Sequence, residues 1–259
     1  TLFIFERIRG DIMKKILNLS HRGFSGKYPE NTKIAFLKAI EYSDCDGFET
    51  DVHMTKDKKL VIIHDDTVDR TCSNGSGFIK DLTSTELLQM EFGSHKGSEF
   101  LGEKIIFLEE LLQIVKDNKL FLNLELKNNY VFYSGLEEAV INMVKDFGLK
   151  DDVILSSFNH ESMEICKKID SSFKTGLLFE SPLMNTVEYM KGIKHEAVHP
   201  GYYMLLQKPS WAVEFKKMGL EINTWTVNDE KYMKYLIEMG VDALIGNYPD
   251  LTSKVLKNL

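Results

Sequence analysis

Short apolar runs alternate with amphipathic stretches along nearly the whole chain. This alternation predicts parallel strands joined by crossover helices. We expect strands at 16–20, 46–51, 120–125, 153–157, 174–179, 195–199, 221–226 and 242–246. We expect helices at 31–43, 108–117, 135–147, 159–169, 183–191, 208–218, 229–239 and 250–258. Eight strands, each followed by a helix, predict an α/β protein with a (β/α)8 TIM barrel.

A further extended run at 60–64 has no helix before it and follows the polar segment 56–59. This arrangement predicts a hairpin with a two-residue turn at Asp57-Lys58, which would pair Asp51 with His64. Residues 66–105 then form an insertion after the second strand, rich in Ser, Gly and Thr, with one helix at 84–90. Loops of this length are usually functional. We interpret this insertion as a small subdomain of one TIM-barrel catalytic domain spanning 13–259.

Met13, followed by two lysines, resembles a natural start, so residues 1–12 are expected to be non-native or an upstream extension. The chain has 259 residues, of which 43% are hydrophobic and 27% charged, as in globular proteins. No apolar run is long enough for a membrane span.

The net charge of −7 comes without a basic stripe, which argues against nucleic acid as a partner. Cys45, Cys72 and Cys166 are scattered and lack CxxC spacing, so neither a disulfide framework nor a thiolate metal site is expected. A cytoplasmic location is the default interpretation. The sequence leaves a homodimer open.

Three carboxylates fall where strands are expected to end at the mouth of the barrel. Glu49 and Asp51 are two residues apart on one strand, so both point to the same side. Glu125 ends the next expected barrel strand. Three such oxygen ligands suit a hard cation, Mg²⁺ or Ca²⁺. The alternative is a set of rim carboxylates paired with Arg22 and Lys127.

His21 and His64 also lie at strand ends, beside these carboxylates. Two imidazoles at one mouth can act as base and acid across a phosphorus centre, although a lone histidine is more often structural. His53 shares the face of Glu49 and Asp51, and we favour a wall position over a ligand role. The remaining histidines, His95, His160 and His195, follow no pattern and are assigned to surface or structural roles.

Arg22 and Lys127 supply positive charge for a phosphate group, and they can also pair with the carboxylates. Glu30 and Asn31 are expected to give structural support where a helix opens, with Asn31 or Thr32 as its cap. Trp225 could pack against a small polyol or fill the top of the barrel. The substrate-binding set further includes two residues at the ends of apolar runs, Phe158 and His199.

Several short motifs occur in order along the chain and together resemble the glycerophosphodiester phosphodiesterase family, bacterial cytosolic type. The similarity runs from about Ile16 to the C-terminus. The motifs are His21-Arg22-Gly23, Pro29-Glu30-Asn31-Thr32, Glu49-x-Asp51, Thr55-Lys56-Asp57, His64-Asp65, Arg70-Thr71, Glu125-x-Lys127, Trp225-Thr226-Val227-Asn228 and Gly246-Asn247-Tyr248-Pro249-Asp250.

This resemblance implies hydrolysis of a small-molecule glycerophosphodiester to sn-glycerol 3-phosphate and an alcohol. It implies a divalent cation on the three carboxylates, acid/base catalysis by His21 and His64, and a two-step route through a cyclic phosphate. It also implies that residues 66–105 cover the glycerol end of the substrate. The chain departs from the family pattern at Gly246-Asn247, where Thr-Asp is common.

Two other functions stay open. A lysophospholipase D-like or phospholipase C-like enzyme would call for an apolar mouth, and Phe78, Phe92 and Phe100 of the insertion are too few and too spread to argue for it. A non-catalytic barrel that binds phosphate esters would be indicated by the loss of a histidine or carboxylate, yet the whole set is present.

Overall fold

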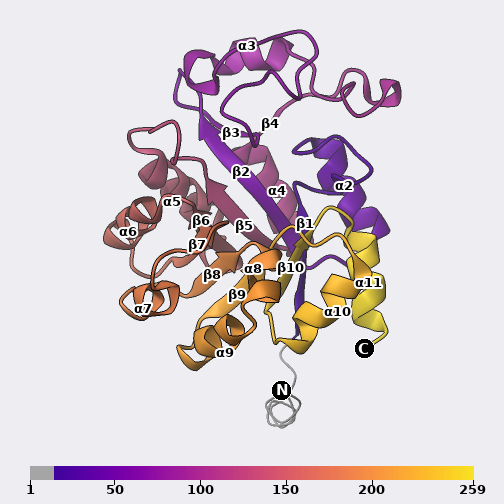
Figure 1. The fold of residues 1–259 in the computed structure, drawn as a ribbon. Coiled ribbons are helices and arrows are strands. Elements are labelled where there is room, and N and C mark those ends of the chain that lie inside the picture. The colour runs from indigo at the N-terminus through magenta and orange to yellow at the C-terminus, as the bar shows by residue number, and fades with distance from the viewer. Residues whose placement is uncertain (1–14) are drawn as a thin grey trace.

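The computed structural model describes residues 15–259, so the expected extension at 1–12 lies outside the described residues. Eight parallel strands close into a barrel in the order β1-β10-β9-β8-β7-β6-β5-β2, with β2 paired back to β1 (Figure 1). The predicted TIM barrel is confirmed. Its strands are β1 (Leu17–His21), β2 (Gly47–Met54), β5 (Phe121–Leu126), β6 (Val153–Ser157), β7 (Lys174–Phe179), β8 (Ala197–Pro200), β9 (Glu221–Thr224) and β10 (Ala243–Gly246).

Helices follow the barrel strands close to the expected positions. They are α2 (Lys33–Tyr42), α4 (Leu108–Asn118), α5 (Leu136–Phe147), α6 (His160–Ile169), α7 (Thr186–Lys191), α8 (Tyr202–Gln207), α9 (Ser210–Lys217), α10 (Glu230–Glu238) and α11 (Pro249–Lys257). The connection after β8 holds two helices rather than the single one expected at 208–218. Pro209 separates them, because the residue before a proline disfavours helical backbone.

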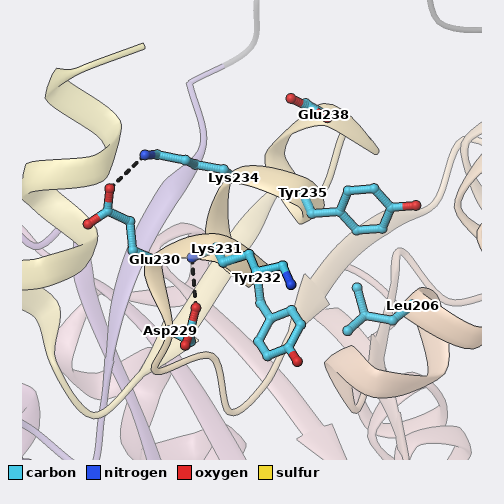
Figure 2. A pocket seen from close by; sticks show the side chains of 8 residues that line it. All are labelled: Leu206, Asp229, Glu230, Lys231, Tyr232, Lys234, Tyr235 and Glu238. Carbon is cyan, nitrogen blue, oxygen red and sulfur yellow. Dashed lines mark hydrogen bonds and ion pairs between the residues drawn. The ribbon is translucent and has the colours of Figure 1, made fainter. Parts of the chain in front are cut away.

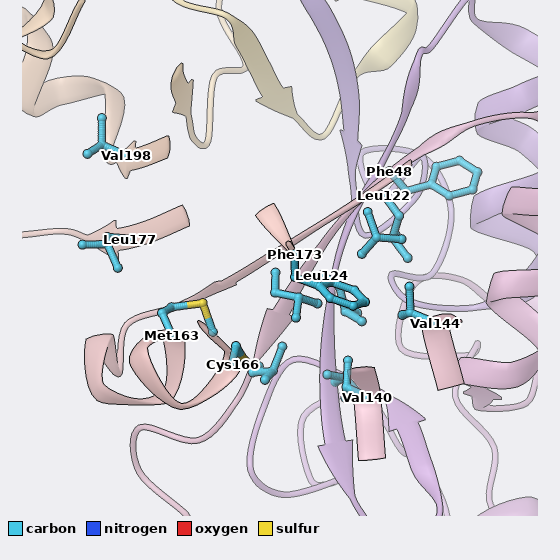
Figure 3. Packing of buried hydrophobic residues seen from close by; sticks show 14 of the residues in the cluster. Phe48, Leu122, Leu124, Val140, Val144, Met163, Cys166, Phe173, Leu177 and Val198 are labelled. Atoms are coloured by element: carbon cyan, nitrogen blue, oxygen red, sulfur yellow. The ribbon is translucent and has the colours of Figure 1, made fainter. Parts of the chain in front are cut away.

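The main core lies between the outside of the barrel and the helices. Leu122 and Leu124 of β5 alternate with interior residues and pack toward Val140 and Val144 of α5 (Figure 3). Both faces of the parallel strands are therefore covered. Leu19, Ala243 and Ile245 form a separate apolar cluster from the alternate positions of β1 and β10, which fills part of the barrel interior.

The predicted hairpin exists, but its register differs by one residue. β3 (Leu60–Ile62) pairs antiparallel with β2 so that Val52 lies opposite Ile62, and the Ile63 amide donates to the Asp51 carbonyl. The predicted pairing of Asp51 with His64 is therefore wrong, and the loop has three residues, 56–58.

Side-chain hydrogen bonds explain the wider turn. The Lys59 amide donates to Thr55 Oγ1 at 2.9 Å, and this hydroxyl donates to Asp57 Oδ1 at 2.7 Å. Lys58 adopts a left-handed φ of 64°, which the third loop position of such a hairpin uses. His64 consequently lies just beyond the end of β3.

Residues 66–105 leave and rejoin the barrel at one place, because β4 (Ile106–Phe107) pairs antiparallel with β3. The insertion carries α3 (Ser84–Gln89), which confirms the expected helix, and short 3-10 turns at Ile79–Asp81 and Ser98–Phe100. A third such turn, Lys150–Asp152, precedes β6. Val68, Ile79, Leu87 and Phe92 belong to a hydrophobic cluster separate from the main core. Figure 1 places this region beyond the far end of β2.

Candidate active site

Glu49, Asp51 and Glu125 meet at the mouth of the barrel. Parallel pairing of β2 with β5 sets Asp51 directly beside Glu125, and Glu49 shares their face two residues earlier. One oxygen from each residue lies within 4.8 Å of the others, and all three side chains are buried. The predicted cluster of carboxylates is therefore present, in an arrangement that could hold a metal ion.

The donor set fits a hard divalent cation. Glu49 Oε2 is a buried oxygen that accepts no hydrogen bond from a described residue, and the only cation near Asp51 Oδ1 and Glu125 Oε1 among the described residues is Lys127, which the two oxygens share. A buried oxygen without a partner is costly unless a cation or a donor faces it. Oxygen ligands alone are what Mg²⁺ and Ca²⁺ prefer.

Two buried cations flank the carboxylates. Lys127 Nζ lies 3.0 Å from Asp51 Oδ1 and 2.7 Å from Glu125 Oε1, and Arg22 Nε lies 3.3 Å from Asp51 Oδ2. Burial acts to raise the pKa of Asp51, but Lys127 and Arg22 lower it more, so this pKa lies well below its ordinary value. Both predicted roles of these cations, phosphate binding and carboxylate pairing, are compatible with these contacts.

The pKa values of the two glutamates move in the opposite direction. Burial, followed by the charges of Asp51 and Glu125, raises the pKa of Glu49 well above its ordinary value. Burial also raises the pKa of Glu125, although Lys127 opposes it. Without a bound cation, the cluster therefore favours one ionised carboxylate over three, because like charges and desolvation both disfavour ionisation.

The side chain of His21 is nearly enclosed at the end of β1. Its Nδ1 lies 2.6 Å from Asn247 Oδ1, which also accepts from Ser25 Oγ at 3.2 Å. Because an amide oxygen only accepts, Nδ1 carries the proton of the neutral ring and Nε2 carries none; Nε2 lies 3.6 Å from Glu49 Oε2. Burial and then the charge of Arg22 lower the pKa of His21 to about 3.

The side chain of His64 is about one third exposed and points Nδ1 at Asp65 Oδ1, 2.6 Å away. His53 supports the same segment from within the barrel wall. Its Nε2 donates to the His64 carbonyl at 3.2 Å, and its Nδ1 accepts from the Tyr133 hydroxyl at 2.9 Å. Burial lowers the pKa of His53 to about 4, so this imidazole is neutral. The favoured wall position of His53 agrees with these contacts.

Two non-glycine residues with left-handed backbone lie next to the carboxylates. Arg22 has a φ of 58° and Asn31 a φ of 57°, and the Asn31 amide donates to the Arg22 carbonyl. Asn31 Nδ2 donates to Asp51 Oδ2 at 3.0 Å, so Asn31 supports Asp51 directly. Thr32 rather than Asn31 caps α2, because its side chain accepts from the Ala35 amide.

Phe158 and Trp225 form an edge-to-face pair with ring centroids 5.6 Å apart at the barrel mouth. Trp225 Nε1 donates to the carbonyl of His199, whose ring is fully buried. His199 Nε2 accepts from Asn223 Nδ2 at 3.0 Å. Burial lowers the pKa of His199 to about 3. The substrate-binding roles of these three residues stay predictions.

A surface pocket of about 830 Å³ lies elsewhere, between α8 and α10 (Figure 2). Leu206, Tyr232 and Tyr235 line it together with charged side chains of α10. None of its lining residues belongs to the predicted site, so this pocket lies apart from the carboxylates and the two histidines. No helix within residues 15–259 combines the length and apolar character needed to cross a membrane.

Three residues in these contacts were given no role from the sequence. Asn247 holds His21, Asp65 holds His64, and Arg70 bonds both Asp65 and Glu30. Asn247 follows a strand end, so the rule that identified the carboxylates could have identified it. The partners of Arg70 lie in a distant helix-opening segment and beside a histidine, which no local pattern indicates.

Buried carboxylates, two imidazoles and two cations meet at one mouth of the barrel. This set of groups suits a phosphate ester, because cations bind its negative charge and imidazoles can transfer protons. The family model described as "Glycerophosphoryl diester phosphodiesterase family" matches residues 21–251. The chain belongs to this family, as the motifs indicated.

Individual relatives agree. A glycerophosphodiester phosphodiesterase of Caldanaerobacter subterraneus is 39% identical over 91% of this chain and 96% of its own length. The structure of an Oleispira antarctica phosphodiesterase in complex with the product sn-glycerol-3-phosphate has a TM-score of 0.82 at 28% identity, covering 94% of this chain and 97% of that one. A Silicibacter pomeroyi structure has a TM-score of 0.84 at 21% identity, covering 94% of each chain, and shows the shared fold.

Proposed function

We propose that this enzyme hydrolyses glycerophosphodiesters to sn-glycerol 3-phosphate and an alcohol, using a divalent cation, Mg²⁺ or Ca²⁺, and two histidines. The observation that carries the proposal is the convergence of Glu49, Asp51 and Glu125 between two imidazoles that each have one nitrogen held by an acceptor. The named activity of the Caldanaerobacter relative and the product in the Oleispira structure support the substrate class.

Glu49, Asp51 and Glu125 would hold the cation. When bound, it supplies Lewis-acid neutralisation of charge at the phosphoryl oxygens. Arg22 and Lys127 stand beside the same carboxylates and would face the remaining phosphate charge. Arg22 would present its planar donor fork to two oxygens, whereas Lys127 would act as a point charge.

His21 and His64 would move the protons. Each has Nδ1 occupied by an acceptor, which leaves Nε2 for the reaction. One Nε2 would take the proton of the attacking hydroxyl, and the other would protonate the departing alcohol oxygen. The family resemblance favours attack by the substrate's own 2-hydroxyl, after which water opens the cyclic phosphate.

Further features complete the proposal. Residues 66–105 would cover the glycerol end of the substrate, and Phe158, Trp225 and His199 would line its binding site. Glu30 and Asn31 would support Arg22 and Asp51. All three cysteines are free, as a reducing compartment would keep them, so a cytoplasmic location stays our proposal.

A turnover assay tests the activity. Purified protein is given glycerophosphocholine or glycerophosphoethanolamine, with Mg²⁺, with Ca²⁺, or with EDTA, and glycerol 3-phosphate is measured. We expect turnover with metal and none with EDTA, restored on adding metal back. Full activity in EDTA would remove the metal from the proposal. Choline release from lysophosphatidylcholine alone would favour a lysophospholipase D-like enzyme, and substrate binding without turnover would indicate a non-catalytic barrel.

A further inference from the structure

Arg70 lies in the insertion, five residues after Asp65, and its guanidinium contacts two carboxylates at once. Nε donates to Asp65 Oδ2 at 2.7 Å and Nη2 to Asp65 Oδ1 at 3.0 Å. On its other edge, Nη1 donates to Glu30 Oε2 at 2.9 Å and Nη2 to Glu30 Oε1 at 2.7 Å. Both contacts are bidentate, which restrains the orientation of each carboxylate more tightly than a single hydrogen bond would.

The Asp65 contact determines which nitrogen of His64 is free. Asp65 Oδ1 accepts from Arg70 and also faces His64 Nδ1 at 2.6 Å. The hydrogen bond from His64, followed by those from Arg70, holds the pKa of Asp65 below its ordinary value against the effect of burial. An ionised carboxylate only accepts, so Nδ1 of His64 carries the hydrogen and Nε2 faces away from Asp65.

The Glu30 contact leads to the other half of the site. Glu30 Oε1 accepts from Arg70 Nη2 and from Arg22 Nη1, the latter at 3.0 Å. Arg22 in turn places Nε 3.3 Å from Asp51 Oδ2. Burial would raise the pKa of Glu30, but the hydrogen bonds from Arg70 and the charge of Arg22 bring it to about 2. Glu30 therefore stays ionised and restrains the guanidinium of Arg22.

We infer that Arg70 is a positioning residue, which orients His64 through Asp65 and Arg22 through Glu30. It thereby holds His64, which follows the hairpin, in a fixed position relative to Arg22 at the end of β1. This role rests on the proposed hydrolysis. Without Arg70, Asp65 keeps among the described residues only its bond to His64, so the two side chains can rotate together, and Glu30 loses the bidentate partner that holds it in place beside Arg22. A lysine at this position cannot contact both carboxylates in the same bidentate manner.

The two branches predict different kinetic effects. The Asp65 branch acts on a proton-transferring group, so its loss lowers kcat. The Glu30 branch acts on a phosphate-binding group, so its loss raises KM. Arg70→Gln should do both, with kcat falling roughly 10–100-fold, the range typical of residues that orient a site from outside it. Asp65→Asn should lower kcat alone, and Glu30→Gln should mainly raise KM.

The experiment measures kcat and KM for glycerophosphocholine at saturating Mg²⁺ in Arg70→Gln, Arg70→Lys, Asp65→Asn, Glu30→Gln and the double variant Asp65→Asn/Arg70→Gln. If Arg70 acts on kcat through Asp65, Arg70→Gln lowers kcat by less than about 3-fold in the Asp65→Asn background, because the effects of coupled residues are not additive. Arg70→Lys should recover only part of the wild-type rate.

Lys96→Gln is the matched control, because Lys96 Nζ also joins the insertion to the barrel, donating to the Ser25 carbonyl at 2.6 Å without touching Asp65 or Glu30. It should retain wild-type kinetics. If Lys96→Gln lowers kcat as much as Arg70→Gln does, loss of contact between the insertion and the barrel is sufficient to explain both effects, and the inference is overturned.

A second measurement does not depend on turnover. The ¹⁵N chemical shifts of His64 should report an Nδ1-protonated imidazole in the wild type and a mixture of tautomers in Arg70→Gln and Arg70→Lys. Unchanged tautomers in both variants would overturn the inference. The inference would also be overturned if Arg70→Gln lowered kcat as much in the Asp65→Asn background as in the wild type. That result would indicate direct contact of Arg70 with the substrate. Failure of the wild type to hydrolyse any glycerophosphodiester would instead refute the proposed function.

Discussion

The ends of the barrel strands and the hairpin with its insertion hold their parts of the candidate site by different means. On the barrel side, Glu49, Asp51 and Glu125 are placed by backbone register, since β2 and β5 pair directly at Asp51 and Glu125. Their side chains are buried. To shift the backbone under Asp51 or Glu125, hydrogen bonds between β2 and β5 would have to break.

On the hairpin side, His64 lies two residues beyond the end of β3, and its side chain is about one third exposed. Its position depends on side-chain contacts: Asp65 on its ring, His53 on its carbonyl, and Arg70 behind Asp65. Each of these contacts can be removed by a single substitution without breaking the barrel. We call Glu49, Asp51, Glu125 and Lys127 the barrel half of the site, and His64 with Asp65 and Arg70 the hairpin half. We therefore expect substitutions in the barrel half mainly to lower stability, and substitutions in the hairpin half mainly to lower activity while stability stays nearly unchanged.

The largest effect we expect is a loss of turnover, and it should be similar for the histidine of the barrel strand and the histidine after the hairpin. His21→Ala and His64→Ala should each lower turnover roughly 10²–10⁴-fold if both imidazoles transfer protons. Steady-state kinetics with glycerophosphocholine would measure this, with His195→Ala as control, because His195 bonds Glu164 and Thr175 near the start of β7, at the opposite end of the strands from the carboxylates. Near-wild-type turnover in either variant would remove that histidine from the mechanism.

The next effect should fall on the barrel half and appear as lost stability. Lys127→Met removes the cation between Asp51 and Glu125, and breaking a buried charge pair costs about 3–5 kcal/mol. Denaturant unfolding without metal would measure this, and added Mg²⁺ should restore part of the loss by replacing the charge. Lys33→Met removes an exposed pair with Glu110 and should change stability by about 1 kcal/mol or less. Equal losses of stability in Lys127→Met and Lys33→Met would contradict the proposal that buried charge pairs stabilise the barrel half of the site.

A smaller effect should fall on the hairpin half and appear as lost activity. Two glycines inserted between Asp57 and Lys58 would disturb the Thr55–Lys59 turn that sets His64. Misplacement by about 1 Å can lower the rate about 10²-fold, so we expect a loss of roughly 10–100-fold. Stability should change by about 1 kcal/mol or less, because loop closure depends weakly on length.

The same insertion after Met239, on the opposite face of the barrel, is the control and should leave kcat unchanged. Activity and stability that fall together in the Asp57 variant would show that the hairpin is part of the folding core rather than a support for His64.

The carboxylates were predictable because they follow local rules. Alternation along a strand puts Glu49 and Asp51 on one face, and the barrel rule puts strand ends at one mouth. The hairpin register was not predictable from polarity alone. It depends on the Thr55 hydroxyl and on the left-handed backbone of Lys58, a residue type that rarely signals that conformation.

Contacts between distant segments were the least predictable. Asn247 and His21 are 226 residues apart, and Arg70 and Glu30 are 40 apart. Residues of these types can bond many partners. Which residues pair is therefore determined by closure of the barrel and by the fold of the insertion, and no local sequence pattern indicates it. β4 was missed for a simpler reason, since two residues are too few to form an alternating pattern.

The smallest effect we expect concerns pH and the cation. The pKa of Glu49 lies well above its ordinary 4.5 in the folded chain. Between these two values the unfolded chain has released a proton that the folded chain keeps, so stability without metal falls as pH rises through this window. Glu125 acts in the same direction. Asp51, with its lowered pKa, contributes stability above about pH 4 that is lost only at lower pH.

A cation requires ionised ligands, so the Tm increase that Mg²⁺ produces should grow from near zero at about pH 5 to about 3 °C or more at about pH 8. Thermal melts with and without Mg²⁺ across this range would measure the difference. Glu49→Gln is the matched variant, because it keeps the size of the side chain but cannot ionise, and its Mg²⁺-dependent increase should be smaller and depend less on pH. If the Mg²⁺-dependent Tm increase of the wild type did not depend on pH, the cation would bind outside this cluster. The proposed metal would then not stabilise the barrel half of the site.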